Sequence, residues 1–176
     1  MSIGVLAVDP GASCGVAYLR GGSAASFTMR KPDERKVYDV LFAAKPYVHA
    51  LVIEGQHVQF HGPKDEAPVL NWPSLESLVL ARARWEVIGK LLGMDVEIVL
   101  RQTWQGPMLL DAETPTETTK QRAKRSVTRT WSEVTLITDF VGKKGKPRPS
   151  ARVPSDQRDA LLLGRWYQLY GNHRHW

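Results

Sequence analysis

The sequence predicts an α/β fold in which helices flank a mixed five-stranded sheet. Three short aliphatic runs come first, at residues 3–9, 13–19 and 24–29, and turn-forming residues separate them. Because short turns join antiparallel neighbours, these runs are expected to form a three-stranded meander. Two further runs, at 50–54 and 95–100, each follow a helical pattern and are expected to be the two parallel strands.

Four segments have the apolar spacing of a helix. They are residues 33–45, 74–92, 120–133 and 156–170. The second is the best defined, because Pro73 or Ser74 marks its start and Gly93 its end. It carries one apolar stripe that includes Trp85 and a second that includes Leu91. One side is therefore expected to face the sheet, and the other a neighbouring helix or a second subunit.

Three segments lack a regular period and are expected to be irregular: 55–72, 101–119, and 142–154 as a Lys/Pro/Gly linker. A loop as long as the first one is usually functional or mobile in a compact domain. His57 and His61 are four residues apart in it, but no third ligand is near, which disfavours a zinc site. The better functional expectation is that this loop contacts a binding partner through His57 and Phe60.

Length and composition indicate one domain that spans residues 1–176. The single cysteine, Cys14, lies in an apolar segment, so it is expected to be a buried thiol, and an internal disulfide or a cysteine-based zinc site is excluded. No stretch approaches the ~20 apolar residues of a membrane span, and the N-terminus lacks the layout of a signal peptide. We expect a soluble, cytoplasmic protein.

Positive charge is concentrated in one region. The net charge is +6, and ten basic residues against two acidic ones between Lys120 and Arg152 give this region a local balance of +8. A solvated face is the simple alternative, but the scarcity of balancing acids favours a surface that follows nucleic-acid phosphates. The basic residues expected to contact DNA are Lys120, Arg122, Lys124, Arg125, Arg129, Lys143, Lys144, Lys146 and Arg148.

Four acidic residues stand at element ends. Asp9 and Glu54 each close an apolar run, and Asp156 and Asp159 open the last helical pattern. Strands one and four are expected to be parallel, so the first two carboxylates emerge at the same edge of the sheet. The other two lie three residues apart on one helix face. Four carboxylates that meet would repel one another unless a divalent cation lay between them.

Carboxylate oxygens suit Mg²⁺ or Mn²⁺. Two such ions about 3.5–4 Å apart can activate water and stabilise the leaving oxygen in phosphodiester cleavage. On this hypothesis Asp9 bridges both ions, Glu54 and Asp159 hold one each, and Asp156 orients the attacking water. Aspartates at a helix start can instead complement the helix dipole, with Ser155 as N-cap. A glutamate directly after Leu-Val-Ile favours the metal site.

These motifs resemble those of the RuvC-type Holliday junction resolvases. Val8 to Ala17 is similar to their opening strand–turn–strand, Leu51 to Glu54 to their second acidic strand, and Asp156 to Ala160 to their closing acidic helix start. The helix after Pro73 and a basic helix near Lys120 also fit. The short separation of the first two acids is closer to the phage-type members, which implies a prokaryotic, phage-encoded protein.

The resemblance implies a ribonuclease H-like fold and a homodimer that cuts two strands of a four-way DNA junction. It also implies two divalent ions per active site and no small-molecule cofactor. By the family's motifs, Asp9, Glu54, Asp156 and Asp159 are the catalytic carboxylates, and Lys120 is near a basic position used against the DNA backbone.

Two positions depart from the family. His57 stands where an aromatic residue often helps to open the junction, and Gln105 follows Trp104 where a lysine is common. The mode of junction opening and the sequence preference are therefore not predicted.

Three other functions remain open at this point. The same fold and metals could act on an RNA–DNA hybrid or structured RNA, and the basic segment alone could bind a junction without cutting it. The turn from Asp9 to Gly15 also resembles the phosphate-binding hairpin of sugar-kinase and actin-type ATPases. Those proteins need two such domains, which 176 residues do not accommodate.

Overall fold

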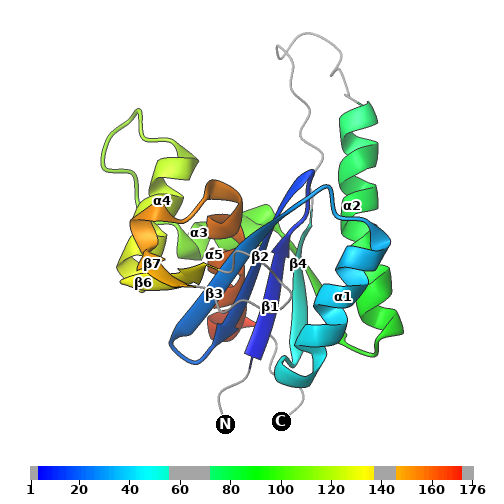
Figure 1. The fold of residues 1–176 in the computed structure, drawn as a ribbon. Helices are drawn as coiled ribbons and strands as arrows, with labels where there is room; N and C mark the ends of the chain where they lie inside the picture. Colours follow the sequence, from blue (N-terminus) through cyan, green and yellow to red (C-terminus); the bar gives the residue numbers. More distant parts are fainter. Residues whose placement is uncertain (1–3, 56–71, 137–145, 172–176) are drawn as a thin grey trace.

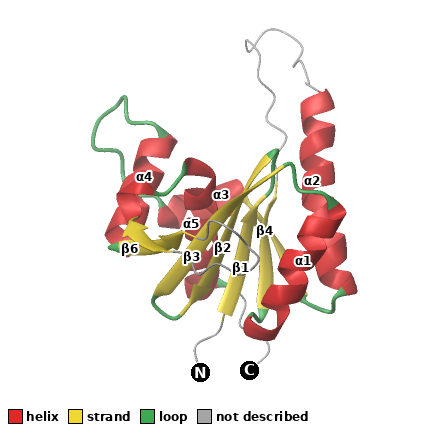
Figure 2. Ribbon diagram, in the orientation of Figure 1, coloured by secondary structure: helices red, strands yellow, loops and turns green. Residues whose placement is uncertain are grey.

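A central mixed sheet lies between two layers of helices (Figures 1 and 2). The computed structural model describes residues 4–55, 72–136 and 146–171. Its strands are β1 (Gly4–Asp9), β2 (Ser13–Arg20), β3 (Ser23–Arg30), β4 (Ala50–Gly55), β5 (Asp95–Leu100), β6 (Glu133–Leu136) and β7 (Lys146–Pro149). They are ordered β5-β4-β1-β2-β3-β6-β7. The predicted α/β class with a mixed sheet is confirmed.

The pairing of the first five strands follows the prediction. β1, β2 and β3 form an antiparallel meander, while β4 is parallel to β1 and β5 is parallel to β4. The predicted number of five strands was too small, because β6 pairs with β3 and β7 pairs with β6. Each of these two strands has only four residues. β7 reads Lys-Pro-Arg-Pro, and its prolines fit the sheet edge where it lies.

The helices are α1 (Glu34–Ala44), α2 (Trp72–Leu91), α3 (Arg101–Met108), α4 (Thr119–Thr130) and α5 (Ser155–Tyr170). The four predicted helices are present, with ends that differ by a few residues. The prediction that residues 101–119 are irregular was wrong for α3. Gly106 and Pro107 lie inside this short helix and obscure its pattern, since both residues disfavour a helix interior. Short 3₁₀ turns follow α1 and precede α5.

Side-chain caps define where two helices begin. The Asp33 carboxylate accepts a hydrogen bond of 2.8 Å from the backbone N–H of Lys36 and so starts α1. Thr118 and Gln121 form a reciprocal capping box at the start of α4. α5 begins differently, because its N-cap is Pro154, which makes no side-chain cap bond. The prediction of Ser155 as N-cap was therefore wrong, since it is already the first helical residue.

Alternate residues of each strand face different helical layers. In β1, Leu6 and Val8 pack with Trp85 of α2, whereas Val5 and Ala7 pack with the buried leucines of α5. α1 and α2 cover the first face, and α3, α4 and α5 lie on the other (Figure 1). Residues two apart along a strand share a layer, so position in the alternation decides which helices a side chain meets.

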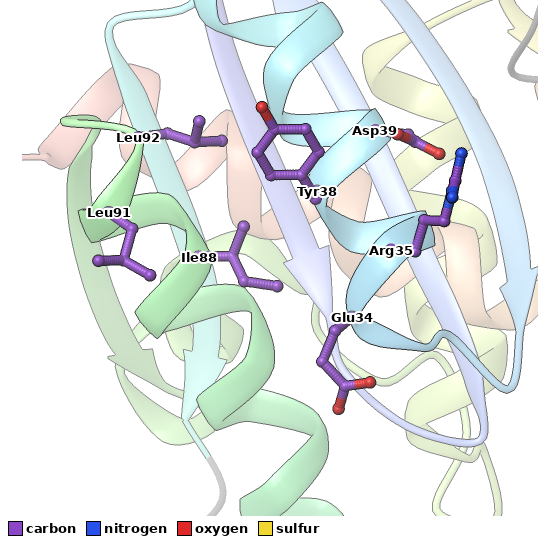
Figure 3. Close-up of a pocket in the computed structure, with 7 residues that line it drawn as sticks. All are labelled: Glu34, Arg35, Tyr38, Asp39, Ile88, Leu91 and Leu92. Atoms are coloured by element: carbon purple, nitrogen blue, oxygen red, sulfur yellow. The ribbon is translucent and has the colours of Figure 1, made fainter.

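The α2 layer holds the buried thiol and an open apolar surface. Cys14 is buried, as predicted, and burial raises the pKa of its thiol. Trp85 of the first stripe is buried, whereas Val87 and Leu91 of the second are 53% and 81% exposed. A pocket of about 600 Å³ lies between α1 and α2, where Tyr38 and Ile88 are among its lining residues (Figure 3).

Among the described residues, no helix is long and apolar enough to cross a membrane.

Candidate active site

The sheet register places Asp9 beside Glu54. Val8 of β1 pairs with Ile53 of the parallel strand β4, so the next residue of each strand is one of the two acids. Both acids continue the alternation of the α5 layer, to which Ala7 and Val52 belong. Their carboxylates therefore lie on one face at one end of the sheet. Glu54 is fully buried, which is rare for a charged residue without a partner.

The first turn of α5 brings Asp156 and Asp159 to the same place. α5 packs across β1 and β2, and its start approaches β2 most closely at Gly15. A Cβ atom at Gly15 would lie 1.9 Å from the backbone oxygen of Asp156, so only glycine permits this approach. The four acids that the sequence singled out thus come from β1, β4 and α5 and meet in one region.

The acids perturb one another electrostatically. Burial raises the pKa of Asp9 well above its ordinary value, and the charges of Glu54, Asp159 and Asp156 raise it further. Burial also raises the pKa of Glu54 and of Asp159, and in both cases Arg101 partly offsets the effect. Burial makes the charged form of these three carboxylates unfavourable. A cation that bound among them would therefore be strongly stabilised.

Among the described residues, Arg101 forms ion pairs with this acidic cluster, and it was not one of the predicted site residues. Its Nε donates to Glu54 Oε1 at 2.7 Å, and its Nη2 is 3.4 Å from Asp159 Oδ2. Burial lowers the pKa of Arg101, but the neighbouring carboxylates, led by Glu54, raise it overall. The signal was present in the sequence, because Arg101 directly follows β5 and continues the alternation of Val99, which lies in the α5 layer.

Trp104 fixes the other oxygen of Glu54. Its indole Nε1 donates to Glu54 Oε2 at 3.2 Å, and the side chain is fully buried. Trp104 and Arg101 both belong to α3, the helix that was not predicted. Together they engage both oxygens of the buried carboxylate.

Two hydroxyls hold Asp156. Thr28 donates to its Oδ2 at 2.6 Å and Ser13 donates to the same oxygen at 3.2 Å. The amide of Gln157 donates to Thr28 at 2.9 Å and accepts from Ser26 at 2.6 Å. Because Thr28 accepts from Gln157, its own proton is directed at Asp156. These partners lie more than a hundred residues apart in the chain, so no local pattern predicts them.

The donor chemistry fits a hard divalent cation. Within residues 4–55, 72–136 and 146–171, no three His, Cys, Asp or Glu side chains already stand in a geometry that could hold a metal ion. However, Asp9, Glu54 and Asp159 offer only carboxylate oxygens, the ligands that Mg²⁺ and Mn²⁺ prefer. Arg101 now supplies the positive charge that such an ion would supply. A carboxylate oxygen can accept more than one partner, but the positive charge of Arg101 would repel an ion at Glu54 Oε1, so Arg101 and the ion would compete for this oxygen.

The expected DNA-binding residues have different surroundings. Burial raises the pKa of Asp159, and the charge of Lys120, in the first turn of α4, partly offsets this effect, so Lys120 lies near the acids. Lys124 and Arg129 are exposed on α4. Arg122 instead donates to the backbone oxygen of Leu110 at 2.6 Å.

Arg125 is also engaged within the protein. It forms ion pairs with Glu113 at 2.8 Å and Glu117 at 2.7 Å. Glu113 and Glu117 lie before Lys120 in the chain, so the charge counted between Lys120 and Arg152 does not include them. That count therefore overstates the positive charge that is not paired within the protein. Lys146 and Arg148 belong to β7. His57, Phe60, His61, Lys143 and Lys144 lie outside the described residues.

Comparisons with known proteins bear on the fold. No protein-family model matches the chain, and no curated protein sequence matches it. The structure is similar to that of Thermus thermophilus RuvC in complex with a Holliday junction substrate, with 13% identity, a TM-score of 0.59 and 96% of each chain covered. A second Thermus thermophilus RuvC structure shares 17% identity and a TM-score of 0.50, over 96% of this chain and 97% of that one. The chain therefore has the RuvC-like, ribonuclease H-like fold that the sequence resemblance implied.

Proposed function

We propose that this chain is a divalent-metal-dependent endonuclease that cuts branched DNA at four-way junctions. The observation that carries the proposal is the meeting of Asp9, Glu54, Asp156 and Asp159 at one end of the sheet, where burial raises the pKa of Asp9, Glu54 and Asp159. Such a set calls for a cation. The fold is that of RuvC, which in one of the two similar structures holds a Holliday junction substrate.

The residues of this site would have different roles in phosphodiester cleavage. Asp9, Glu54 and Asp159 would hold Mg²⁺ or Mn²⁺, with two ions per site as the working hypothesis. Bound ions of this kind supply an activated water and neutralise the leaving oxygen of a phosphodiester. Trp104 keeps one oxygen of Glu54 in a fixed direction. Asp156 is held by two hydroxyl partners, and it would orient the attacking water.

Positive charge for DNA lies next to the acids. Lys120 is close to Asp159, and Lys124 and Arg129 extend an exposed basic surface along α4. Lysine and arginine on such a surface contact phosphates without reading sequence. The other predicted contacts stay predictions: Lys146 and Arg148 belong to β7, and those in 56–71 and 137–145 lie outside the described residues.

A homodimer would provide two such sites. Two opposed cuts in one junction require two catalytic centres, and the exposed stripe of α2 with Val87 and Leu91 is the apolar face we propose for pairing. It lies in the layer opposite the acids, so pairing there would leave both sites open to DNA (Figure 1).

The test is cleavage of a synthetic immobile four-way junction with Mg²⁺ or Mn²⁺, beside a linear duplex and an RNA–DNA hybrid. We expect symmetric paired nicks in the junction. Asp9→Asn should abolish cutting while junction binding survives. Asp39→Asn, which removes an acid from the α1 layer, should keep full activity. Cleavage of the hybrid alone would reject the junction substrate, and retained cutting by Asp9→Asn would move the active centre elsewhere.

A further inference from the structure

Glu54 is a buried carboxylate with two unequal partners. Trp104 holds Oε2 from a fully buried position, so it has no room to withdraw. Arg101 holds Oε1 at 2.7 Å, and its side chain is 46% exposed. A long, half-exposed side chain can turn into solvent at little cost, because its charged end stays hydrated when it leaves. Oε1 is therefore the oxygen of Glu54 that can be freed.

Arg101 also reaches a second proposed metal ligand. Its Nη2 lies 3.4 Å from Asp159 Oδ2, so a single guanidinium joins a carboxylate of β4 to one of α5. A buried carboxylate left without a partner is strongly destabilising. The same guanidinium would repel a divalent ion that approached these oxygens, since like charges at short distance are costly inside a protein.

We propose that Arg101 is a displaceable counter-ion of the acidic cluster. In the metal-free protein it partly offsets the charges of Glu54 and Asp159 and joins β4 to α5 at the site. Arg101 would leave Glu54 Oε1 when a divalent cation binds to the acids, while Trp104 would keep the carboxylate turned toward the cluster. Metal binding and the Arg101–Glu54 pair therefore exclude each other. This inference rests on the proposed function, because it assumes that the acids bind metal.

The first test measures Mn²⁺ binding to the full chain by titration calorimetry. Arg101→Gln removes the competing charge, so we expect Mn²⁺ to bind about tenfold more tightly, within the usual range for coupled sites. Arg101→Lys keeps the charge and should bind Mn²⁺ nearly as the wild type does. The matched control is Arg84→Gln, which breaks an ion pair of the same 2.7 Å length with Glu34, on α1. Its Mn²⁺ affinity should not change.

A second test measures the wild-type protein, and the conservative variant Arg101→Lys serves only for assignment. The hydrogen-bonded Nε–H of Arg101 gives an NMR signal that is identified by its loss in Arg101→Lys. Saturating Mg²⁺ should shift or remove this signal and leave that of Arg84 in place. An unmoved Arg101 signal in the Mg²⁺-bound protein would overturn the inference.

The outcomes separate the inference from the proposed function. If the wild type binds Mn²⁺ but Arg101→Gln binds it equally or more weakly, the inference is overturned and the nuclease proposal stands. An equal gain in Arg101→Lys would also overturn it, because the charge would then not be the competitor. If neither the wild type nor Arg101→Gln binds Mn²⁺, the metal site itself is absent and both proposals fall.

Discussion

Glu54 illustrates how one residue depends on its neighbours. Its carboxylate is fully buried, and only α3 supplies the donors described for it. Trp104→Phe removes the N–H that holds Oε2 and should lower the free energy of unfolding by about 1–3 kcal/mol, the cost of an unpaired buried group. It should also slow junction cleavage, because Glu54 loses its direction. Urea unfolding and single-turnover cleavage measure the two effects.

The control for that change is Trp85→Phe. Trp85 is equally buried, but it lies in the opposite layer of the core, with Leu6 and Val8 of β1. This change should lower stability without a comparable loss of cleavage. Equal catalytic losses in both variants would mean that Trp104 acts through general packing.

Asp9 should make the metal-free protein sensitive to pH. Its pKa is raised above the ordinary 3.8, mainly by burial, so the folded state holds this proton more tightly than the unfolded state. The charged form therefore costs stability as pH rises from about 4, and the cost is largest at neutral pH. Asp9→Asn should raise the metal-free Tm at pH 7, by about 2–4 °C for each kcal/mol. The gain should vanish near pH 4.

Thermal unfolding with EDTA at both pH values measures this gain. Mn²⁺ should then raise the Tm of the wild type at pH 7 and leave that of Asp9→Asn nearly unchanged. A variant that is less stable than the wild type at pH 7 without metal would contradict the burial effect.

The sequence could predict the four acids, because strand ends and a helix start are visible locally. It could not reveal the partners that hold them. Arg101 becomes meaningful only when β5 is known to lie beside β4 and the alternation of Val99 is followed one step further. Thr28 and Ser13 contact Asp156 across more than a hundred residues. Pairings of that kind depend on how whole elements pack.

Among the elements, β2 and α5 meet at one glycine. Gly15→Ala would place a methyl group 1.9 Å from the backbone oxygen of Asp156, so α5 would have to move off the sheet. We expect a loss of about 1–3 kcal/mol, as for other overpacked positions, together with loss of cleavage. The control is Gly22→Ala, where no atom lies within 4 Å. Denaturant unfolding and junction cleavage compare the two variants.

The basic residues of α4 include some that are exposed to solvent and others that are paired within the protein. Lys124 and Arg129 are exposed, whereas Arg125 is paired with Glu113 and Glu117. The double change Lys124→Gln and Arg129→Gln should reduce the slope of log affinity against log salt by about 1–2, as expected when up to two phosphate contacts are lost. Fluorescence anisotropy with labelled junction DNA measures the slope.

The comparison for α4 is Arg125→Gln. It should lower stability and change the salt slope little, because its guanidinium holds the loop before the helix rather than phosphate. A larger slope change in Arg125→Gln than in the double variant would reverse this assignment of the free and engaged residues.

Elements with a strong apolar periodicity could be predicted from the sequence, and elements with a weak one could not. The meander, α2 and α5 have clear apolar patterns. β6 and β7 are short. They gain their strand conformation from pairing, β6 with β3 and β7 with β6, rather than from their own residues. α3 is obscured by Gly106 and Pro107. The resemblance to a known family placed the acids in order but contained no information about these three elements.

At the scale of the whole molecule, the two layers of helices have different roles. The acids belong to the α5 layer, and the exposed stripe with Val87 and Leu91 belongs to α2. Val87→Glu with Leu91→Glu should convert a dimer to a monomer, because charges would face one another in the proposed interface. Sedimentation velocity measures the mass. The variant should nick single strands of the junction without symmetric pairs.

An unchanged mass in that variant would place any dimer contact elsewhere. A wild type that sediments as a monomer even when bound to a junction would instead remove the dimer from the proposal and leave the chemistry of each site untouched.

The alternation of β1 between two cores has a consequence for how the chain tolerates insertions. If one residue were added within β1, the strand could still hydrogen-bond to β2 and β4, but every later side chain of β1 would exchange faces. Asp9 would then turn toward Trp85 and the thiol of Cys14, and away from Glu54. Length changes in this strand should therefore be far more damaging to the proposed active site than conservative substitutions within it.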